Sequence, residues 1–188
     1  MASVAAQDGW ILEASQNSNT GGTINSTGST FSLGDDGAKR QYRGLLSFNT
    51  GANIPDNATI TSVVLKVKKQ AIAGGGNPVA IFQGFMADIK NGFFGTAGGL
   101  QITDFQAVGS GTVGPVSGTL NGAVYSINLT PGKAFINKLS INSGLTQVRL
   151  RFKLDDNNNA IANILSLYSG NAALAADRPQ LVITYTLP

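Results

Sequence analysis

The residues of this chain that could do chemistry are mostly carboxylates, because the chain has no histidine and no cysteine. That absence removes the serine–histidine triad, the cysteine nucleophile, the histidine base and the zinc ion held by histidine or cysteine. Glu13 is the single glutamate among ten acidic residues, and the rest are aspartates. Glycoside hydrolysis would need two carboxylates placed across one sugar. Nearly all of the aspartates lie in turn-forming segments, so the sequence predicts a protein that is not an enzyme.

One acidic and amide-rich run, residues 155–159, has the side chains that a hard cation prefers. Asp155, Asn157 and Asn159 have the alternate spacing of the first ligands in a calcium loop. However, Ala160 replaces the glycine of an EF-hand, and no glutamate stands at the twelfth position. Two interpretations stay open: a Ca²⁺ site at these three residues, and, favoured, a hairpin turn in a protein without a cofactor.

Cations alternate with apolar residues in three segments that read as strands. The six cations are Arg43, Lys66, Lys68, Arg149, Arg151 and Lys153. If the three strands share one sheet, these side chains form a basic face. One interpretation is that these cations only keep an exposed sheet face soluble. The other interpretation is a binding site for an acidic polymer, whose carboxylates or sulfates pair with guanidinium groups. Nucleic acid fits less well, because the aromatic residues of these strands lie on the other side.

Aromatic residues offer a second candidate surface. Phe93 and Phe94 stand in a glycine-rich loop, where a ring could stack on a sugar or on a partner. The favoured interpretation is that the loop folds over one end of the protein and buries its rings. Trp10 is the only tryptophan. Its ring could stack on a sugar, but the favoured interpretation is that it packs in the core.

The elements that must position these side chains are strands, because apolar residues alternate with a period of two along much of the chain. The clearest case is Gly44–Val67, in which two alternating runs flank a loop containing Pro55 and Asp56. The predicted strands are Trp10–Ala14, Thr30–Leu33, Tyr42–Asn49, Thr59–Gln70, Val79–Ile89, Leu100–Val108, Ala123–Leu129, Thr146–Leu154, Ile161–Ser169 and Gln180–Thr186. Residues 16–29 read as an exposed loop.

A change of period predicts one short helix after Leu129. Thr130 would cap it and Pro131 would begin it, while Phe135 and Leu139 recur at a spacing of four. Short strands punctuated by turns, with one helix, favour an all-β, jelly-roll-like antiparallel β-sandwich.

Length and composition predict one domain over residues 1–188, with residues 1–7 flexible. Only 12% of the residues are charged, and the net charge of +3 is too small to argue for nucleic acid. The start of the chain reads as neither a signal peptide nor an anchor, and no apolar run is long enough to span a membrane.

Four motifs, taken in order, resemble the DNRLRE module, a family related to archaeal disaggregatase repeats and to an alginate-binding group of carbohydrate-binding modules. The motifs are Asp8-Gly9-Trp10-Ile11, Leu45-Leu46-Ser47-Phe48-Asn49, Ile54-Pro55-Asp56-Asn57-Ala58-Thr59-Ile60 and Arg178-Pro179-Gln180-Leu181-Val182-Ile183-Thr184-Tyr185. The resemblance covers nearly the whole chain. It implies a jelly-roll-like sandwich found on extracellular polysaccharide-active enzymes and cell-surface proteins, usually as a binding or spacer module.

Two functions of different classes are therefore expected. The first is a non-catalytic extracellular or cell-surface module that binds a polysaccharide, in particular an anionic, uronic-acid one. The alternative is a structural protomer or spacer of an extracellular filament, surface layer or adhesin, which would associate with copies of itself. Neither requires nucleic acid or insertion into a membrane.

Overall fold

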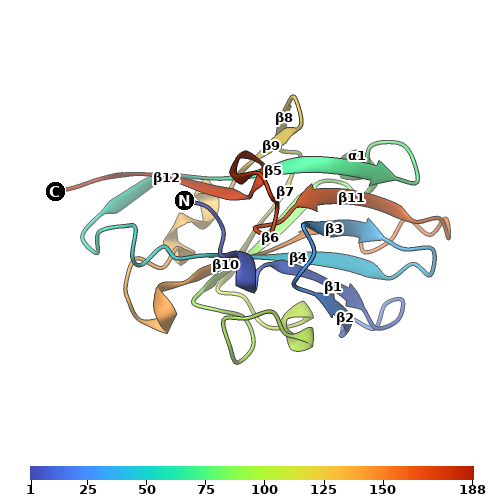
Figure 1. Cartoon of the computed structure of the whole chain (residues 1–188), viewed down its shortest axis with the longest axis horizontal. Helices are drawn as coiled ribbons and strands as arrows, with labels where there is room; N and C mark the ends of the chain where they lie inside the picture. The colour runs from blue at the N-terminus through green and yellow to red at the C-terminus, as the bar shows by residue number, and fades with distance from the viewer.

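The alternating segments form a curled antiparallel sheet in the computed structural model, which describes residues 1–188 (Figure 1). The strands are β1 (Gly9–Glu13), β2 (Gly21–Asn25), β3 (Thr30–Asp35), β4 (Gln41–Phe48), β5 (Thr59–Ala73), β6 (Phe85–Asn91), β7 (Gly111–Val116), β8 (Thr119–Asn121), β9 (Val124–Asn128), β10 (Thr146–Phe152), β11 (Asn163–Tyr168) and β12 (Gln180–Thr186). The helices are α1 (Pro78–Ile81) and the 3₁₀ turns η1 (Ala5–Gln7), η2 (Ile102–Phe105), η3 (Thr130–Phe135), η4 (Asn142–Gly144) and η5 (Ala175–Asp177). The predicted all-β class is confirmed.

The sheet curls because β5 serves two layers. The strand order is β7-β6-β10-β4-β3-β11-β5-β9-β8, with β1 beside β4, β2 beside β1 and β12 beside β5. The first part of β5 pairs with β12 and β9, from Thr59 to Lys68, whereas its last residues pair with β11, from Lys69 to Ala73. The fold is therefore sandwich-like, but its two layers are continuous through one 15-residue strand.

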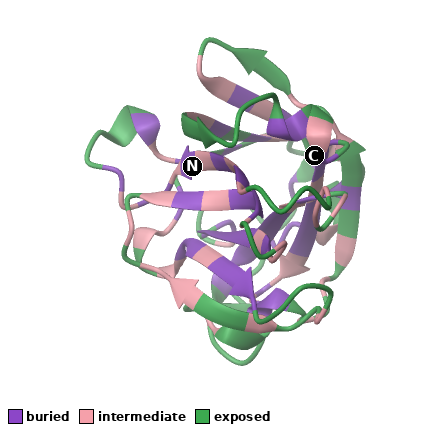
Figure 2. Ribbon diagram, turned by 90° about the vertical axis from the view of Figure 1, so that its right-hand side faces the viewer, coloured by how far each residue is buried: buried purple, intermediate pink, exposed green.

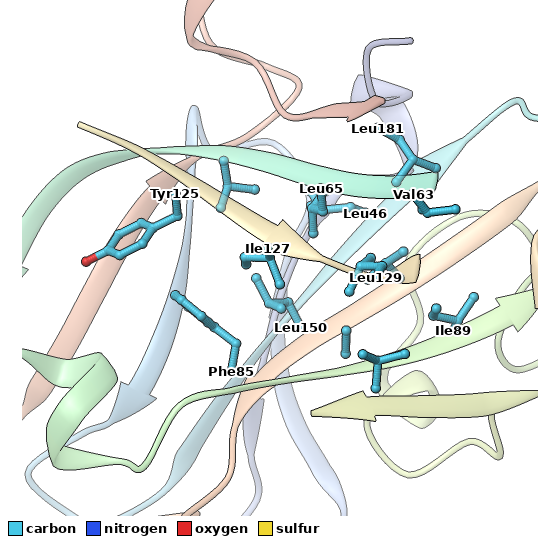
Figure 3. Close-up of a cluster of buried hydrophobic side chains, with 14 of the residues drawn as sticks. Leu46, Val63, Leu65, Phe85, Ile89, Tyr125, Ile127, Leu129, Leu150 and Leu181 are labelled. Carbon is cyan, nitrogen blue, oxygen red and sulfur yellow. The ribbon is translucent and has the colours of Figure 1, made fainter. Parts of the chain in front are cut away.

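Apolar side chains from both layers meet in one core. Leu65 of β5, Ile127 of β9 and Leu129, directly after β9, face Phe85 of β6 and Leu150 of β10 (Figure 3). All of these residues are fully buried or nearly so. The Phe85 ring meets the Tyr125 ring edge to face, with 5.3 Å between their centroids, a geometry that aromatic pairs prefer.

Buried and more exposed residues alternate along the strands, as a period of two requires (Figure 2). In β5, Val63, Leu65 and Val67 are buried, while Lys66 between them is exposed. None of the helices is long and apolar enough to cross a membrane.

The first residues, which the sequence predicts to be flexible, form backbone hydrogen bonds with distant parts of the chain. The terminal ammonium of Met1 donates to the carbonyl of Leu181 at 2.9 Å, and the amide of Leu181 donates back to the carbonyl of Met1 at 2.9 Å. Ser3 donates to Pro179 and Val4 to Ser47. These bonds fasten the start of the chain to β12 and β4.

Some predicted elements are wrong. The segment Val79–Ile89 begins as helix α1, because Asn77 caps its first turn and Pro78 cannot donate to a ladder. The predicted strand Leu100–Val108 contains the 3₁₀ turn η2 instead. The predicted loop at residues 16–29 contains β2. The short helix predicted after Leu129 is confirmed as the 3₁₀ helix η3, although Leu129 rather than Thr130 is its N-cap.

Candidate functional site

The predicted basic face does not exist as one surface, because two of its arginines are buried. Arg43 on β4 and Arg149 on β10 are 7% and 6% exposed. Residues 92–108, which we call the cover segment, lie over this side of the sheet and supply backbone acceptors to both arginines. Arg151 is half-buried, and Lys153 is exposed and donates to Gln83.

Arg149 joins β10 to β6 and to the cover segment. Its Nε and Nη2 atoms donate to one carboxylate oxygen of Asp88 at 3.1 and 2.9 Å. Its Nη1 atom donates to the carbonyls of Asp104 and Ala107 at 2.6 and 2.8 Å. The guanidinium lies 4.6 Å from the centre of the Phe94 ring, within the range of a cation–π contact.

Asp88 is held ionised by this arrangement. Burial works in the opposite direction, but Arg149, the Thr112 hydroxyl and Arg151 outweigh it and hold the pKa of Asp88 below its usual value. Arg151 Nε also donates to the Asp88 carboxylate, at 3.2 Å. The carboxylate is therefore shared by two cations and is not free to bind a ligand.

Arg43 is buried without a carboxylate partner. Its donors reach the side-chain oxygens of Gln41 and Asn19 and the carbonyl of Phe105, and its guanidinium lies 3.8 Å from the centre of the Phe105 ring. Burial, together with the nearby Arg149 and Arg151, lowers the pKa of Arg43 to about 10. The side chain stays charged at neutral pH and holds the cover segment to β4.

The candidate aromatic residues are also wholly or partly buried. Phe94 is fully buried, and its amide donates to the Gln147 side chain at 2.7 Å. This burial agrees with the favoured interpretation of the glycine-rich loop as a cover, while Phe93 stays half-buried. Trp10 is half-buried against the core and meets the Tyr42 ring edge to face at 5.2 Å.

The calcium-like run forms a turn in which its oxygens are already engaged. Asp155 accepts from Gln41 at 2.8 Å. The side-chain oxygen of Asn157 accepts from the amide of Asn159, and that of Asn159 accepts from the amide of Ile161. No group of three or more histidine, cysteine, aspartate or glutamate side chains is placed to hold a metal ion. The run lies in the connection between β10 and β11, which do not pair with each other, so the predicted hairpin is wrong. The Ca²⁺ site stays a prediction.

Lys66 and Lys68, the other two predicted cations, line a groove on the outer side of the layer that contains β5, β9 and β12. The groove has a volume of about 290 Å³, and we call it the basic groove. Its lining residues are Lys66, Lys68, Asn121, Val124, Ser126, Ala176, Arg178 and Gln180. Strand register creates it, because Gln180, Lys66 and Ser126 are direct partners across β12, β5 and β9.

The basic groove carries three cations and one adjacent carboxylate. Lys68 forms an ion pair with Asp177, and this hydrogen bond raises the pKa of Lys68. Lys66 is exposed and forms no ion pair. Arg178 uses its Nε atom to donate to Ala172 at 2.8 Å, and its two terminal nitrogens have no partner within the protein. Two cationic donors therefore face the groove free for a ligand.

The sequence interpretation missed Arg178, Gln180 and Asn121. Arg178 and Gln180 are two residues apart, a spacing that places side chains on one side of an extended segment, but only the structure shows that Gln180 pairs with Lys66. Asn121 carried no such signal, since the short strand β8 was not predicted. Its place depends on the β8–β9 hairpin.

The chain matches no family model and no curated protein. The resemblance to the DNRLRE module therefore stays a prediction, carried by the four motifs alone.

Proposed function

We propose that this protein is a non-catalytic binding module for an anionic polysaccharide, located outside the cell or on its surface. The observation that carries the proposal is the basic groove, where the Lys66 ammonium and the terminal nitrogens of Arg178 have no protein partner. A guanidinium can pair with both oxygens of a uronic-acid carboxylate. The side chains of Asn121, Ser126 and Gln180 add neutral donors and acceptors for hydroxyl groups.

The chemistry of the groove favours binding over catalysis. Asp177 is the carboxylate at its edge, and it is 7% exposed and ion-paired with Lys68. A glycosidase would need a second carboxylate across the sugar, and none lines the groove. The groove has no aromatic lining residue, so charge and hydrogen bonds, rather than ring stacking, would hold the sugar.

Affinity electrophoresis tests the proposal. The purified protein would be run through gels containing alginate, pectin, a sulfated glycan or a neutral glucan, at low and moderate salt. We expect retardation by a uronic-acid polymer that weakens as salt screens the contact. The double variant Lys66→Gln/Arg178→Gln should lose this retardation.

A double variant with the same change in charge provides the control. Lys133 and Lys153 are exposed and lie outside the basic groove, so Lys133→Gln/Lys153→Gln should keep the retardation. Equal loss in both variants would show a nonspecific charge effect and overturn the assignment of the groove. Absence of retardation in every gel would overturn the proposed function.

A further inference from the structure

The outer edge of β12 has no strand partner over most of its length. β12 pairs with β5 on one side, and on the other side only the bridge between Ala2 and Gln180 is formed. Leu181 exchanges both of its backbone bonds with Met1. Backbone groups alternate in direction along a strand, so the N–H and C=O groups of Ile183 and Tyr185 point to the same open edge as those of Leu181.

A register shift does not alter this alternation. The pairing with β5 slips after Thr184, where Thr184 faces Ser62 and Tyr185 faces Ile60. The extra residue, Thr61, therefore lies in β5 and not in β12. Its hydroxyl donates to the carbonyl of Thr184 at 3.1 Å, which confirms that the Thr184 carbonyl faces β5.

The other sheet edges are protected in ways that β12 is not. β7 contains Gly114 and Pro115, and its pairing with β6 is irregular. β8 has only three residues. The Gly21 amide of β2 donates to Gln106 at 3.3 Å, next to η2. Proline, irregular pairing, short length and a covering segment all discourage pairing between edges.

The composition of β12 fits pairing with itself. No charged residue occurs from Gln180 to the last residue, and Ile183, Thr184 and Thr186 are β-branched. Three apolar side chains near this edge are exposed: Val182 by 38%, Tyr185 by 37% and Leu187 by 58%. Two copies of a neutral strand meet without repulsion between like charges, so a second copy of this chain suits the edge.

We propose that two copies of this protein pair antiparallel through the free edges of β12, with Tyr185 opposite its counterpart. Met1 already occupies the edge at Leu181, which excludes registers that extend the pairing to that residue. Pairing centred on Tyr185 places Ile183 opposite Leu187 and uses the outward backbone groups of Ile183 and Tyr185. It also covers the exposed Tyr185 and Leu187 side chains, and it joins the two β12 layers into one sheet.

Charge pairing at Tyr185 tests both the edge and the register. Sedimentation velocity over a range of concentrations should show a dimer of the natural chain that dissociates on dilution. Tyr185→Lys and Tyr185→Glu should each be monomeric, because like charges then face each other. An equimolar mixture of the two variants should form a one-to-one dimer. A natural chain that is monomeric at all concentrations overturns the proposal, as does a mixture that fails to associate.

Controls separate this pairing from misfolding and from the polysaccharide proposal. Val182 is as exposed as Tyr185 but lies on the other face of β12, so Val182→Lys should still dimerise. Tyr185→Pro removes one edge N–H group, which an edge strand tolerates, and it should be monomeric with an unchanged circular dichroism spectrum. The pairing does not depend on the proposed function, and Lys66→Gln/Arg178→Gln should still dimerise. A dimer that persists in Tyr185→Lys would place the interface elsewhere and overturn the assignment.

Discussion

Arg149 and Asp88 stabilise the fold rather than serve a ligand. Both are almost fully buried, and the guanidinium also binds two carbonyls of the cover segment. A buried ion pair costs desolvation, and removal of one partner leaves an uncompensated charge or polar group in the interior. The cluster is therefore sensitive to the loss of either member.

Arg149→Met should lower the free energy of unfolding by about 3 kcal/mol, because it removes Asp88's closest cation and leaves the carbonyls of Asp104 and Ala107 without a donor. Urea unfolding followed by circular dichroism would measure the change. Lys153→Met, directly after the end of that strand, is the control, since Lys153 is exposed and should change stability by less than about 0.5 kcal/mol. A similar loss in both variants would contradict the structural role of Arg149.

Asp8 should make stability depend on pH. Burial raises its pKa to about 6 from 3.8, although Ser3 and the amides of Ser47 and Gly170 favour the charged form. The folded state thus holds this proton more tightly than the unfolded chain. The stabilisation is fully present below pH 3.8 and is lost as pH rises to about 6, a difference of about 3 kcal/mol.

Asp8→Asn removes this titration, so the stability of the variant relative to the natural protein should rise between about pH 4 and pH 6. Chemical unfolding at several pH values would give the difference curve. A flat curve for Asp8→Asn would show that burial does not shift this carboxyl.

At the scale of elements, the cover segment depends on the ring of Phe94. Phe94→Ala should cost about 3 kcal/mol, because the ring is fully buried and its loss leaves a cavity beside Arg149. Limited proteolysis should then cut residues 95–104 faster. Phe93→Ala is the matched control: its half-buried ring should cost about 1 kcal/mol and leave the cutting rate nearly unchanged.

The alternation of apolar and polar residues predicted a strand correctly where the segment's own residues determine its secondary structure. It failed where a helix cap or a distant segment determines it. Gln180–Thr186 has the predicted bounds, whereas Val79–Ile89 does not. Asn77 and Pro78 were the available signal for a helix start there. Gln101 and Asp104 form a capping box at η2, which was the signal against a strand over Leu100–Val108.

The candidate site was partly predictable for a related reason. The alternation correctly placed Lys66 on the outer side of β5, which lines the basic groove. It also placed Arg43 and Arg149 on one side of their strands, but that side is covered by residues 92–108. The periodicity within β4 or β10 does not show that a segment 42 to 62 residues away in sequence covers these arginines. Their burial could therefore be found only from the tertiary structure.

At the scale of the whole molecule, contacts between distant parts of the chain close the fold. Met1 and Leu181 are 180 residues apart and exchange two hydrogen bonds. β5 also pairs with β9, β11 and β12, all of which follow it by 50 residues or more. Non-local pairing of this kind is typical of β proteins that fold in milliseconds to seconds.

The shared strand β5 has a thermodynamic consequence. Because the same 15-residue strand is hydrogen-bonded into both layers, separating either layer breaks bonds in the other. We therefore expect a single all-or-none heat-absorption peak, with the calorimetric enthalpy equal to the van't Hoff enthalpy. In hydrogen exchange, the amides of Leu65 and Ser166 should then open together at the free energy of global unfolding, although they belong to different layers.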